Sequence, residues 1–425
     1  MKNKNTLFQK AYDFTEADIV RKAGLYHFFR PMKGSEGTTV KYDEHSLIMT
    51  GSNNYLGLTH DPRVIKAAKE AIDRFGTGCT GSRFLNGNSV LHDELEQRLA
   101  KFLGFESGLV MTTGFLTNYS SINTLVGEGE FILSDAENHA SIIAGCKSSK
   151  ATVISYEHND ANDLRKKLAQ LPAEAGKLIV TDGVFSMTGE IVDLPAIVAV
   201  KKEFKNVALM VDDAHGIGVL GNQGRGTVDH FGLIDDVDFI TITFSKAFAS
   251  LGGFIGGNAK VIDFIRHKAR GFIFSAALPP SATATALKVL DILESDESVL
   301  ANLRHNVAYM KAGFEKLKLP LMPTGTPIFS IKVGEEAKTL MLVKALHQAG
   351  VFSTPVLYPA VAFGNGMIRT SYMASHSKAE LDHVLQVWAV MAKKFGLEVK
   401  KGEVIKTEHH QKGYDFQAIQ GAPVA

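Results

Sequence analysis

Cysteine is scarce in this chain, which has only two, Cys79 and Cys146, among 425 residues. Two cysteines are too few for a disulfide framework, and they show no paired metal-ligand spacing. The sequence therefore predicts neither a disulfide-rich secreted domain nor a bound metal ion. A reducing cytoplasm is the expected setting.

An excess of charge of one sign is absent as well. The chain has 46 Lys and Arg against 45 Asp and Glu, which gives a formal net charge of +1. Proteins that bind nucleic acid usually show a basic excess, so we expect no nucleic-acid partner. Local cationic groups could still bind an anionic ligand.

Long apolar runs are also missing. No stretch of about 18 apolar residues occurs, which argues against a transmembrane helix. The segment from Met1 to Lys10 is polar, with no apolar region behind it, so a secretory signal is not expected. A hydrophobic fraction of 45% is ordinary for a globular protein.

Short apolar runs alternate with helical stretches in the middle of the chain. This alternation predicts an α/β fold with a mostly parallel sheet covered by helices on both faces. Ligands bind beyond the carboxyl ends of the strands in such sheets, so functional residues should follow the runs. The runs are Gly108–Met111, Phe131–Leu133, Thr152–Tyr156, Leu178–Thr181, Val207–Val211 and Phe239–Thr243.

The two ends of the chain differ from the middle in their sequence pattern. Residues 1 to about 40 are predicted to form a helical arm, with an apolar cluster near Phe28 that could pack on this chain or on a partner. Past Pro280, one long helical segment over 282–318 and later strands and helices predict a smaller α+β domain. The expected division is an N-terminal arm (1–60), a large cofactor-binding domain (61–290), a small C-terminal domain (291–398) and a polar tail (399–425).

Two residues that follow predicted strands could carry chemistry. Asp212 follows Val207–Val211, where its carboxylate could meet a cationic group on a ligand or simply cap the next turn. Lys246 follows Phe239–Thr243 among small and apolar residues. Burial would lower the pKa of its amine and free the lone pair for attack on a carbonyl, but an exposed loop lysine is the alternative.

Three weaker candidates lie elsewhere. A helix that begins near Gly114 would offer free N–H groups to a phosphate, although a plain N-cap by Thr113 explains the segment equally well. His139 follows another strand but could be structural. Arg369 could hold a carboxylate with its planar fork or be an ordinary ion-paired side chain.

Together these residues match the needs of pyridoxal 5'-phosphate (PLP): an aldehyde-capturing lysine, an acid for a ring nitrogen, a phosphate cradle, a histidine for the ring and a carboxylate clamp. Sequence motifs for other cofactors are missing. The chain contains no phosphate-binding P-loop, no dinucleotide fingerprint and no His-Glu-x-x-His.

Five motifs occur in the order expected for the α-oxoamine synthases, and over residues 20 to 395 the chain resembles that family. Its members are fold-type I PLP enzymes with an aspartate-aminotransferase-like α/β fold. The resemblance therefore implies a large domain with a mostly parallel sheet and a smaller α+β C-terminal domain. The motifs are Gly51–Gly57, Asn138–Ser141, Asp182–Met187, Asp212–Gly216 and Thr243–Lys246.

The resemblance also implies roles for individual residues. Lys246 would hold PLP, Asp212 would pair with the ring nitrogen, His215 would bond the phenolic oxygen, and His139 would lie on the ring. These four are the expected catalytic residues. Asn53 and Arg369 would bind the substrate carboxylate. The remaining expected cofactor contacts are Gly114, Phe115, Thr243 and Ser245 at the phosphate, Ser186 near the cofactor, and Ser275 at the phosphate of a neighbouring subunit.

Within the family, Gly76–Gly87 and Phe29–Pro31 are most similar to soluble bacterial serine palmitoyltransferases. That similarity implies condensation of L-serine with a long-chain acyl-CoA to 3-oxosphinganine, in a cytoplasmic homodimer with active sites at the interface. The lipophilic product adds an expectation of peripheral contact with the inner membrane. The alternatives are 8-amino-7-oxononanoate synthase, 2-amino-3-ketobutyrate CoA ligase, 5-aminolevulinate synthase or another PLP reaction. A catalytically dead partner subunit is disfavoured because Lys246 is present.

Overall fold

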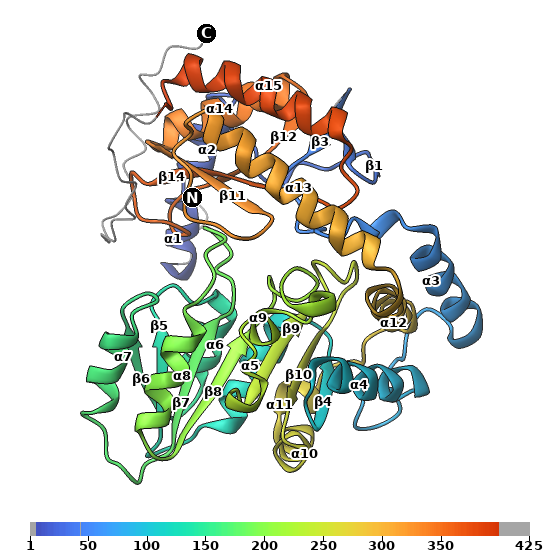
Figure 1. The fold of residues 1–425 in the computed structure, drawn as a ribbon, viewed down its shortest axis with the longest axis vertical. Helices are drawn as coiled ribbons and strands as arrows, with labels where there is room; N and C mark the ends of the chain where they lie inside the picture. Colours follow the sequence, from blue (N-terminus) through green and yellow to red (C-terminus); the bar gives the residue numbers. More distant parts are fainter. Residues whose placement is uncertain (1–5, 43, 399–425) are drawn as a thin grey trace.

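The computed structural model describes residues 6–42 and 44–398. A large sheet with its helices forms one part of the molecule, and two smaller sheets with three long helices form the other (Figure 1). The sequence-based expectation of an aminotransferase-like α/β fold is confirmed.

The large sheet has seven strands in the order β4-β10-β9-β8-β7-β5-β6. Neighbours from β9 to β6 pair in parallel, whereas β10 is antiparallel to both β4 and β9. All six predicted runs are strands here, and β10 is a strand that the apolar pattern did not predict. The strands are β4 (Ser107–Met111), β5 (Phe131–Asp135), β6 (Thr152–Tyr156), β7 (Lys177–Asp182), β8 (Val207–Asp212), β9 (Phe239–Thr243) and β10 (Gly253–Gly257).

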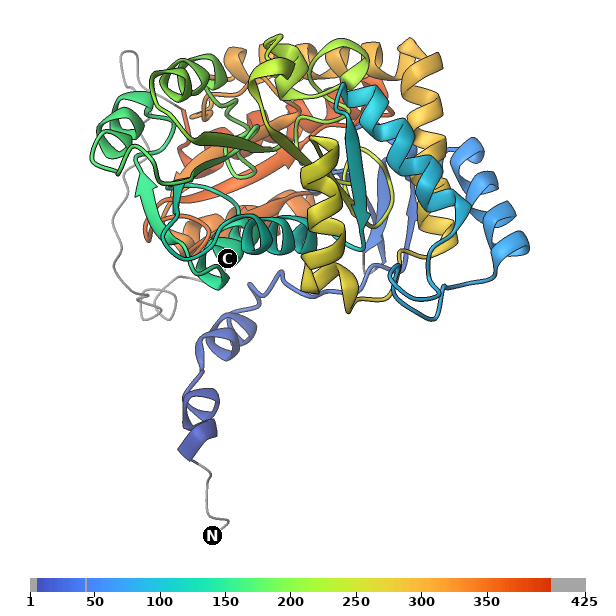
Figure 2. The ribbon, with the colours of Figure 1, turned by 90° about the horizontal axis from the view of Figure 1, so that it is seen from below.

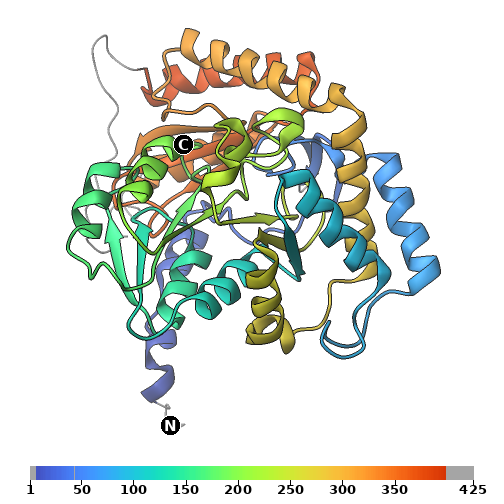
Figure 3. The same ribbon diagram turned by 60° about the horizontal axis from the view of Figure 1, so that its bottom comes forward.

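Helices cover both faces of this sheet, which is why the strands inside it are mostly apolar and buried, whereas the edge strand β6 is largely exposed (Figure 3). Local capping fixes several helix starts; for example, the Asp160 carboxylate accepts hydrogen bonds from the N–H groups of Asn162 and Asp163. The helices of this part are α3 (Pro62–Phe75), α4 (Val90–Leu103), α5 (Gly114–Leu125), α6 (Ala140–Ser148), α7 (Ala161–Leu168), α8 (Leu194–Glu203), α9 (Thr227–His230), α10 (Ala259–Lys268), α11 (Arg270–Ile273) and α12 (Pro280–Ser295).

Parallel pairing brings the carboxyl ends of the central strands to one edge. Asp182 at the end of β7 pairs in register with Asp212 at the end of β8, and Asp212 pairs with Thr241 of β9. Polar residues that are 30 residues or so apart in the sequence therefore lie side by side, as the rule for such sheets predicts.

The C-terminal part is built on an antiparallel sheet in the order β11-β14-β13. The predicted long helical segment over 282–318 consists of two helices: α12 ends at Ser295, and Asp296 caps a new helix by accepting a hydrogen bond from the Ser298 N–H. The elements are α13 (Glu297–Lys316), β11 (Ile328–Gly334), α14 (Glu336–Gln348), β12 (Val351–Phe352), β13 (Thr354–Val356), β14 (Gly366–Ser371) and α15 (Lys378–Phe395).

The N-terminal arm is helical only in its first part. The helices α1 (Gln9–Tyr12) and α2 (Glu16–Lys22) project from the body of the molecule (Figure 2). The expectation of helix to about residue 40 is wrong, because β1 (Gly34–Glu36) and β2 (Thr39–Tyr42) form a hairpin that β3 (His45–Met49) and β12 extend to four strands. Gly37 supplies the left-handed φ of +74° that the hairpin turn requires.

The apolar cluster of the arm packs on this chain. Leu25 and Val20 are buried against Leu340 of α14, with Phe28 partly buried beside them, whereas Phe29 is 96% exposed.

Among the described residues, no helix is long and apolar enough to cross a membrane.

The division into domains stays a proposal. Separate clusters of buried side chains fill the large-sheet part and the C-terminal part. The proposed boundary at residue 290 falls inside α12, and the proposed tail 399–425 lies outside the described residues.

Candidate active site

A cavity of about 950 Å³ opens where the carboxyl edge of the large sheet faces the C-terminal part and the arm. Six of the residues predicted as site residues line it. Its floor is polar, and its outer wall is largely apolar. The six are Asn53, His139, Ser186, His215, Lys246 and Arg369.

Lys246 lies in the loop between β9 and β10, with its amine at the floor of the cavity. Burial lowers the pKa of the amine to about 8, even though the nearby carboxylates of Asp212 and Asp182 act to raise it. About a tenth of this amine is therefore uncharged at pH 7, far more than of an ordinary lysine. An uncharged amine is the form that attacks a carbonyl carbon.

Asp212 is held at the end of β8 by buried hydrogen bonds. The Asn118 side-chain amide donates to its Oδ2 at 2.5 Å, and the Ala214 N–H donates to Oδ1 at 3.0 Å. Asn118 also donates to Ser141 Oγ at 2.9 Å and accepts a hydrogen bond from Thr241 Oγ1 at 2.7 Å. Asn118 thus fixes the Asp212 carboxylate in one orientation.

A second network surrounds His215 and Arg369. The Tyr55 hydroxyl lies 2.6 Å from His215 Nδ1, and Arg369 donates through one terminal nitrogen to Asn53 Oδ1 at 2.8 Å. Arg369 Nε donates to the backbone carbonyl of Ser186 at 2.7 Å. Burial, together with the nearby cations, holds the pKa of His215 well below its usual value, so its ring is neutral.

His139 caps α6 at the neighbouring strand end. Its Nδ1 lies 2.7 Å from Ser141 Oγ, and its backbone N–H donates to the Asp182 carboxylate at 2.9 Å. Burial lowers the pKa of the His139 ring. Burial and the Asp212 charge raise the pKa of Asp182 well above its usual range. The His139 ring is therefore uncharged at neutral pH, and the contacts of His139 with Ser141 and Asp182 fix its orientation.

The N-terminus of α5 packs closely against Thr243, the last residue of β9, three residues before Lys246. The first N–H groups of a helix lack intrahelical partners and favour anions, and those of Gly114 and Phe115 occupy this position. A Cβ at Gly114 would lie 2.6 Å from the Thr243 side chain, so only glycine fits there. Thr243 in turn hydrogen-bonds to Ser245.

Six predicted site residues do not line the cavity: Asp212, Gly114, Phe115, Thr243, Ser245 and, in a different place, Ser275. Ser275 lines a small separate hollow with Thr112 and Leu116 rather than the cavity of Lys246. Its expected contact was with a neighbouring subunit, and that contact stays a prediction.

Comparison with known proteins agrees with this geometry. Residues 46–387 match the family model "Aminotransferase class I and II". A serine palmitoyltransferase of Bacteriovorax stolpii is 46% identical over 391 residues, which cover 92% of this chain and 93% of the relative. The chain belongs to the α-oxoamine synthases of the aminotransferase class I and II family.

Two further members of the family place this chain within it. A structure of an alanine variant of serine palmitoyltransferase from S. paucimobilis, with a bound PLP–myriocin aldimine, has a TM-score of 0.89 and 33% identity, covering 92% of this chain and all of the other. An 8-amino-7-oxononanoate synthase of Bacillus pumilus is 40% identical, covering 90% of this chain and 97% of the relative.

Three residues that organise the site received no role from the sequence. Each lies in a segment in which the sequence analysis assigned a role to another residue: Asn118 follows Gly114, Tyr55 follows Asn53, and Asp182 precedes Ser186. Each is buried and hydrogen-bonded to a predicted site residue. Asn118 had a usable signal, because it lies on the first turns of the helix that begins at Gly114. Its contact with Asp212 spans 94 residues, so spacing alone does not show it.

Proposed function

We propose that this chain is a PLP-dependent serine palmitoyltransferase, which condenses L-serine with a long-chain acyl-CoA to give 3-oxosphinganine, CoA and CO₂. The observation that carries the proposal is a single cavity that combines the Lys246 amine, the Arg369–Asn53 pair and an apolar wall. The 46% identity to a serine palmitoyltransferase over most of the chain supports the choice of reaction.

The residues fit PLP. An amine with a pKa of about 8 can capture an aldehyde, a fixed carboxylate suits a protonated ring nitrogen, and the α5 N-terminus suits a phosphate. We assign these roles to Lys246, Asp212 and the group Gly114, Phe115, Thr243 and Ser245. His215 would bond the phenolic oxygen, with His139 on the ring and Ser186 close by. When bound, PLP supplies an aldehyde for amines and a ring that accepts electrons from the adjoining carbon.

The amino acid's groups meet fixed partners. The Arg369 guanidinium, held by Ser186 and Asn53, is a rigid fork for the serine carboxylate. The Lys246 amine is placed to take the proton from the serine α-carbon, since its lowered pKa makes it a base near neutral pH. The same carboxylate leaves later as CO₂, so its orientation by Arg369 and His139 affects both steps.

The outer wall of the cavity suits an acyl chain. Apolar side chains from the arm (Val20 and Phe28) and from the C-terminal part (Leu340, Val356 and Leu357) line it together. Burying alkyl groups against such a wall stabilises binding by about 0.8 kcal/mol per buried methylene. A long acyl chain therefore gains more from this wall than a short polar one.

Borohydride reduction followed by peptide mapping tests the cofactor role. The protein should be yellow, lose its colour on reduction and carry the label on Lys246; label on another lysine would overturn the assignment. Titration of L-serine, glycine and L-alanine against the cofactor absorbance then tests the substrate. Preference for glycine or alanine would favour another synthase of the family.

We also propose a homodimer with active sites at its interface. Large apolar side chains are exposed around the α5 N-terminus and the glycine-rich loop, where Phe115, Phe84, Leu85 and Phe274 are 50%, 57%, 77% and 78% exposed. Such a patch is typical of a surface that a partner covers. A mass of one chain by sedimentation would contradict the dimer.

A cytoplasmic location with peripheral contact at the inner membrane completes the proposal. Its support is the paucity of cysteine and the lipophilic product of the proposed reaction. Cell fractionation with a high-salt wash tests it: protein that the wash releases from membranes agrees, and protein that stays in the membrane after the wash contradicts it.

A further inference from the structure

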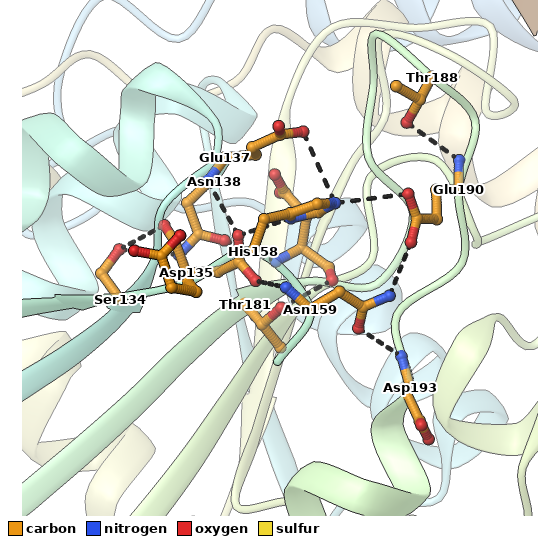
Figure 4. Close-up of polar contacts among 12 residues, drawn as sticks. Ser134, Asp135, Glu137, Asn138, His158, Asn159, Thr181, Thr188, Glu190 and Asp193 are labelled. Atoms are coloured by element: carbon orange, nitrogen blue, oxygen red, sulfur yellow. Dashed lines mark hydrogen bonds and ion pairs between the residues drawn. The ribbon is translucent and has the colours of Figure 1, made fainter. Parts of the chain in front are cut away.

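A half-buried histidine that the proposed reaction does not use lies one strand away from the cavity. His158 stands in the loop after β6, and its side chain is 14% exposed. Its two ring nitrogens face carboxylates from two other segments, the end of β5 and the loop after β7: Nδ1 lies 2.9 Å from Asp135 Oδ1, and Nε2 lies 3.4 Å from Glu190 Oε2 (Figure 4). A third carboxylate, that of Glu137, lies 3.6 Å from Nε2.

These carboxylates hold His158 in its charged form. Burial alone would lower the pKa of the ring, but the hydrogen bonds to Asp135 and Glu190 and the charges of Asp135 and Glu137 outweigh burial and raise the pKa to about 10. The hydrogen bond to His158 in turn lowers the pKa of Glu190. His158 and Glu190 are therefore both ionised at neutral pH. The imidazolium, hydrogen-bonded through both of its ring nitrogens, links the end of β5 to the loop that holds Glu190.

The next residue repeats the link. The Asn159 N–H donates to Asp135 Oδ2 at 2.8 Å, and its side-chain amide donates to Glu190 Oε1, also at 2.8 Å (Figure 4). Its Oδ1 accepts a hydrogen bond from the Asp193 N–H. Asn159 adopts a left-handed φ of +52°, a conformation that asparagine tolerates better than most residues. We call His158, Asn159, Asp135 and Glu190 the charged bracket.

The bracket reaches the cavity through the loop over 183–192. The His158 ring meets the Phe185 ring edge to face, with centroids 4.3 Å apart, and the Phe185 N–H bonds to the Glu190 carbonyl. Ser186 follows directly, and its carbonyl is the one that accepts the hydrogen bond from Arg369 Nε. Movement of this loop would move the partner that fixes the Arg369 fork.

We propose that His158 is a positioning residue for the carboxylate site, because its imidazolium ties Glu190 to Asp135 and so fixes Ser186 under Arg369. The proposal rests on the proposed function in one respect: the ligand of Arg369 is the carboxylate of the amino-acid substrate. His158 itself touches neither substrate nor cofactor.

Substitution of His158 by glutamine tests the bracket in the PLP-loaded enzyme. Glutamine keeps a hydrogen-bonding side chain but loses the charge, so we expect the KM for L-serine to rise about 10-fold with kcat within about threefold and the KM for acyl-CoA unchanged. The matched control is Arg165→Gln, which breaks the exposed Arg165–Glu203 pair between α7 and α8 and should leave all three constants unchanged.

The pH dependence separates positioning from mere stability. A histidine whose folded pKa is raised stabilises its loop fully below its unfolded pKa and loses that effect as pH rises through the folded value. The serine KM instead depends on the charge of His158 in the folded enzyme, where its pKa is about 10. The ratio of serine KM in His158→Gln to that in the unsubstituted enzyme should therefore stay near 10 up to about pH 9 and fall towards 1 only as the pH rises past about 10, whereas a pure stability effect would decline already above about pH 6.5.

A direct titration supplies a second measurement. The imidazole signal of His158 in histidine-labelled protein, assigned by its loss in His158→Gln, should stay in the protonated position through pH 8. A signal that titrates near pH 6.5 would overturn the proposal, as would an unchanged serine KM in His158→Gln or a loss of kcat and thermal stability without any change in that KM.

Glu190→Gln keeps the test decisive if His158→Gln does not fold. This change removes one charge from the rim of the bracket and should raise the serine KM about threefold; an unchanged value would refute the bracket. The two failures are distinguishable. Absence of serine turnover in the unsubstituted enzyme would contradict the proposed function, whereas normal turnover with an indifferent His158 and Glu190 would contradict only the bracket.

Discussion

The floor and the outer wall of the cavity are built in different ways. The floor combines residues at the strand ends of the large sheet, such as Asp212 and His215, with Arg369 of β14 in the C-terminal sheet. Each of the three is buried and hydrogen-bonded to neighbouring side chains. The outer wall joins segments far apart in the sequence, the arm and the C-terminal part, through apolar contacts near Leu340.

This difference separates two tasks. Directional hydrogen bonds on rigid strands fix reacting groups in one geometry, which proton transfer requires. Apolar contacts are non-directional and tolerate changes of shape, which suits the binding of an alkyl chain. We therefore expect changes on the floor to impair turnover whatever the length of the acyl group, and changes in the outer wall to alter only the choice of acyl group.

Lys246→Ala should have the largest effect. Loss of the amine removes both the cofactor anchor and the proposed base, so kcat should fall by at least about 10³-fold even with added PLP, while the fold remains. A steady-state assay measures kcat, and circular dichroism shows whether the fold remains. Lys260→Ala, which alters an exposed lysine on α10, is the control, and activity retained in Lys246→Ala would refute the role.

Asn118→Ala should come second. It leaves the buried Asp212, Ser141 and Thr241 side chains each without one partner, which costs about 1–3 kcal/mol of stability. Misplacement of the carboxylate should lower kcat roughly 10- to 100-fold. Thermal unfolding and kinetics of Asn123→Ala, on the same helix, provide the comparison; equal effects of the two changes would show that Asn118 does not organise the floor.

Arg369→Lys should affect one substrate only. Lysine keeps the charge but cannot reproduce the planar fork held by Ser186 and Asn53, so the KM for L-serine should rise about 10- to 50-fold. The KM for acyl-CoA should hardly change. Arg304→Lys, at an exposed arginine of α13, is the control. A uniform loss with both substrates would argue against a carboxylate role.

Phe28→Ala should have the smallest effect and mark the other side of the comparison. Phe28 is partly buried in the outer wall, so its loss should raise the KM for a C16 acyl-CoA about fivefold and leave the KM for serine unchanged. Phe8→Ala, which alters an arm residue outside the cavity, should do nothing. An equal effect on serine would mean that the wall and the floor are not separable.

The large sheet was predictable because its strands are short, apolar and separated by helical segments. The exception is β10, where Gly253, Gly256 and Gly257 conceal the strand. A Cβ at Gly253 would lie 2.8 Å from the Gly114 Cα, so close packing requires glycine there. Because glycine is not typical of strands, the same residues hide the strand in the sequence. The hairpin near Gly37 was missed because its strands are brief and largely polar.

The candidate site was predictable where a residue follows a strand directly, as Asp212 does. Residues that act through others were not, because their partners come from distant loops. The bracket is an example: Asp135 and Glu190 lie 23 and 32 residues from His158, and no local pattern joins them. Only the folded chain shows that the end of β5 meets the loops that hold His158 and Glu190.

The release of CoA across a panel of acyl-CoA lengths, with L-serine, glycine and L-alanine compared at each length, tests the central claim most directly. The floor and the wall together predict turnover that requires L-serine and is highest near C16. Turnover that prefers glycine or alanine, or that is greatest with short acyl groups, would contradict the account.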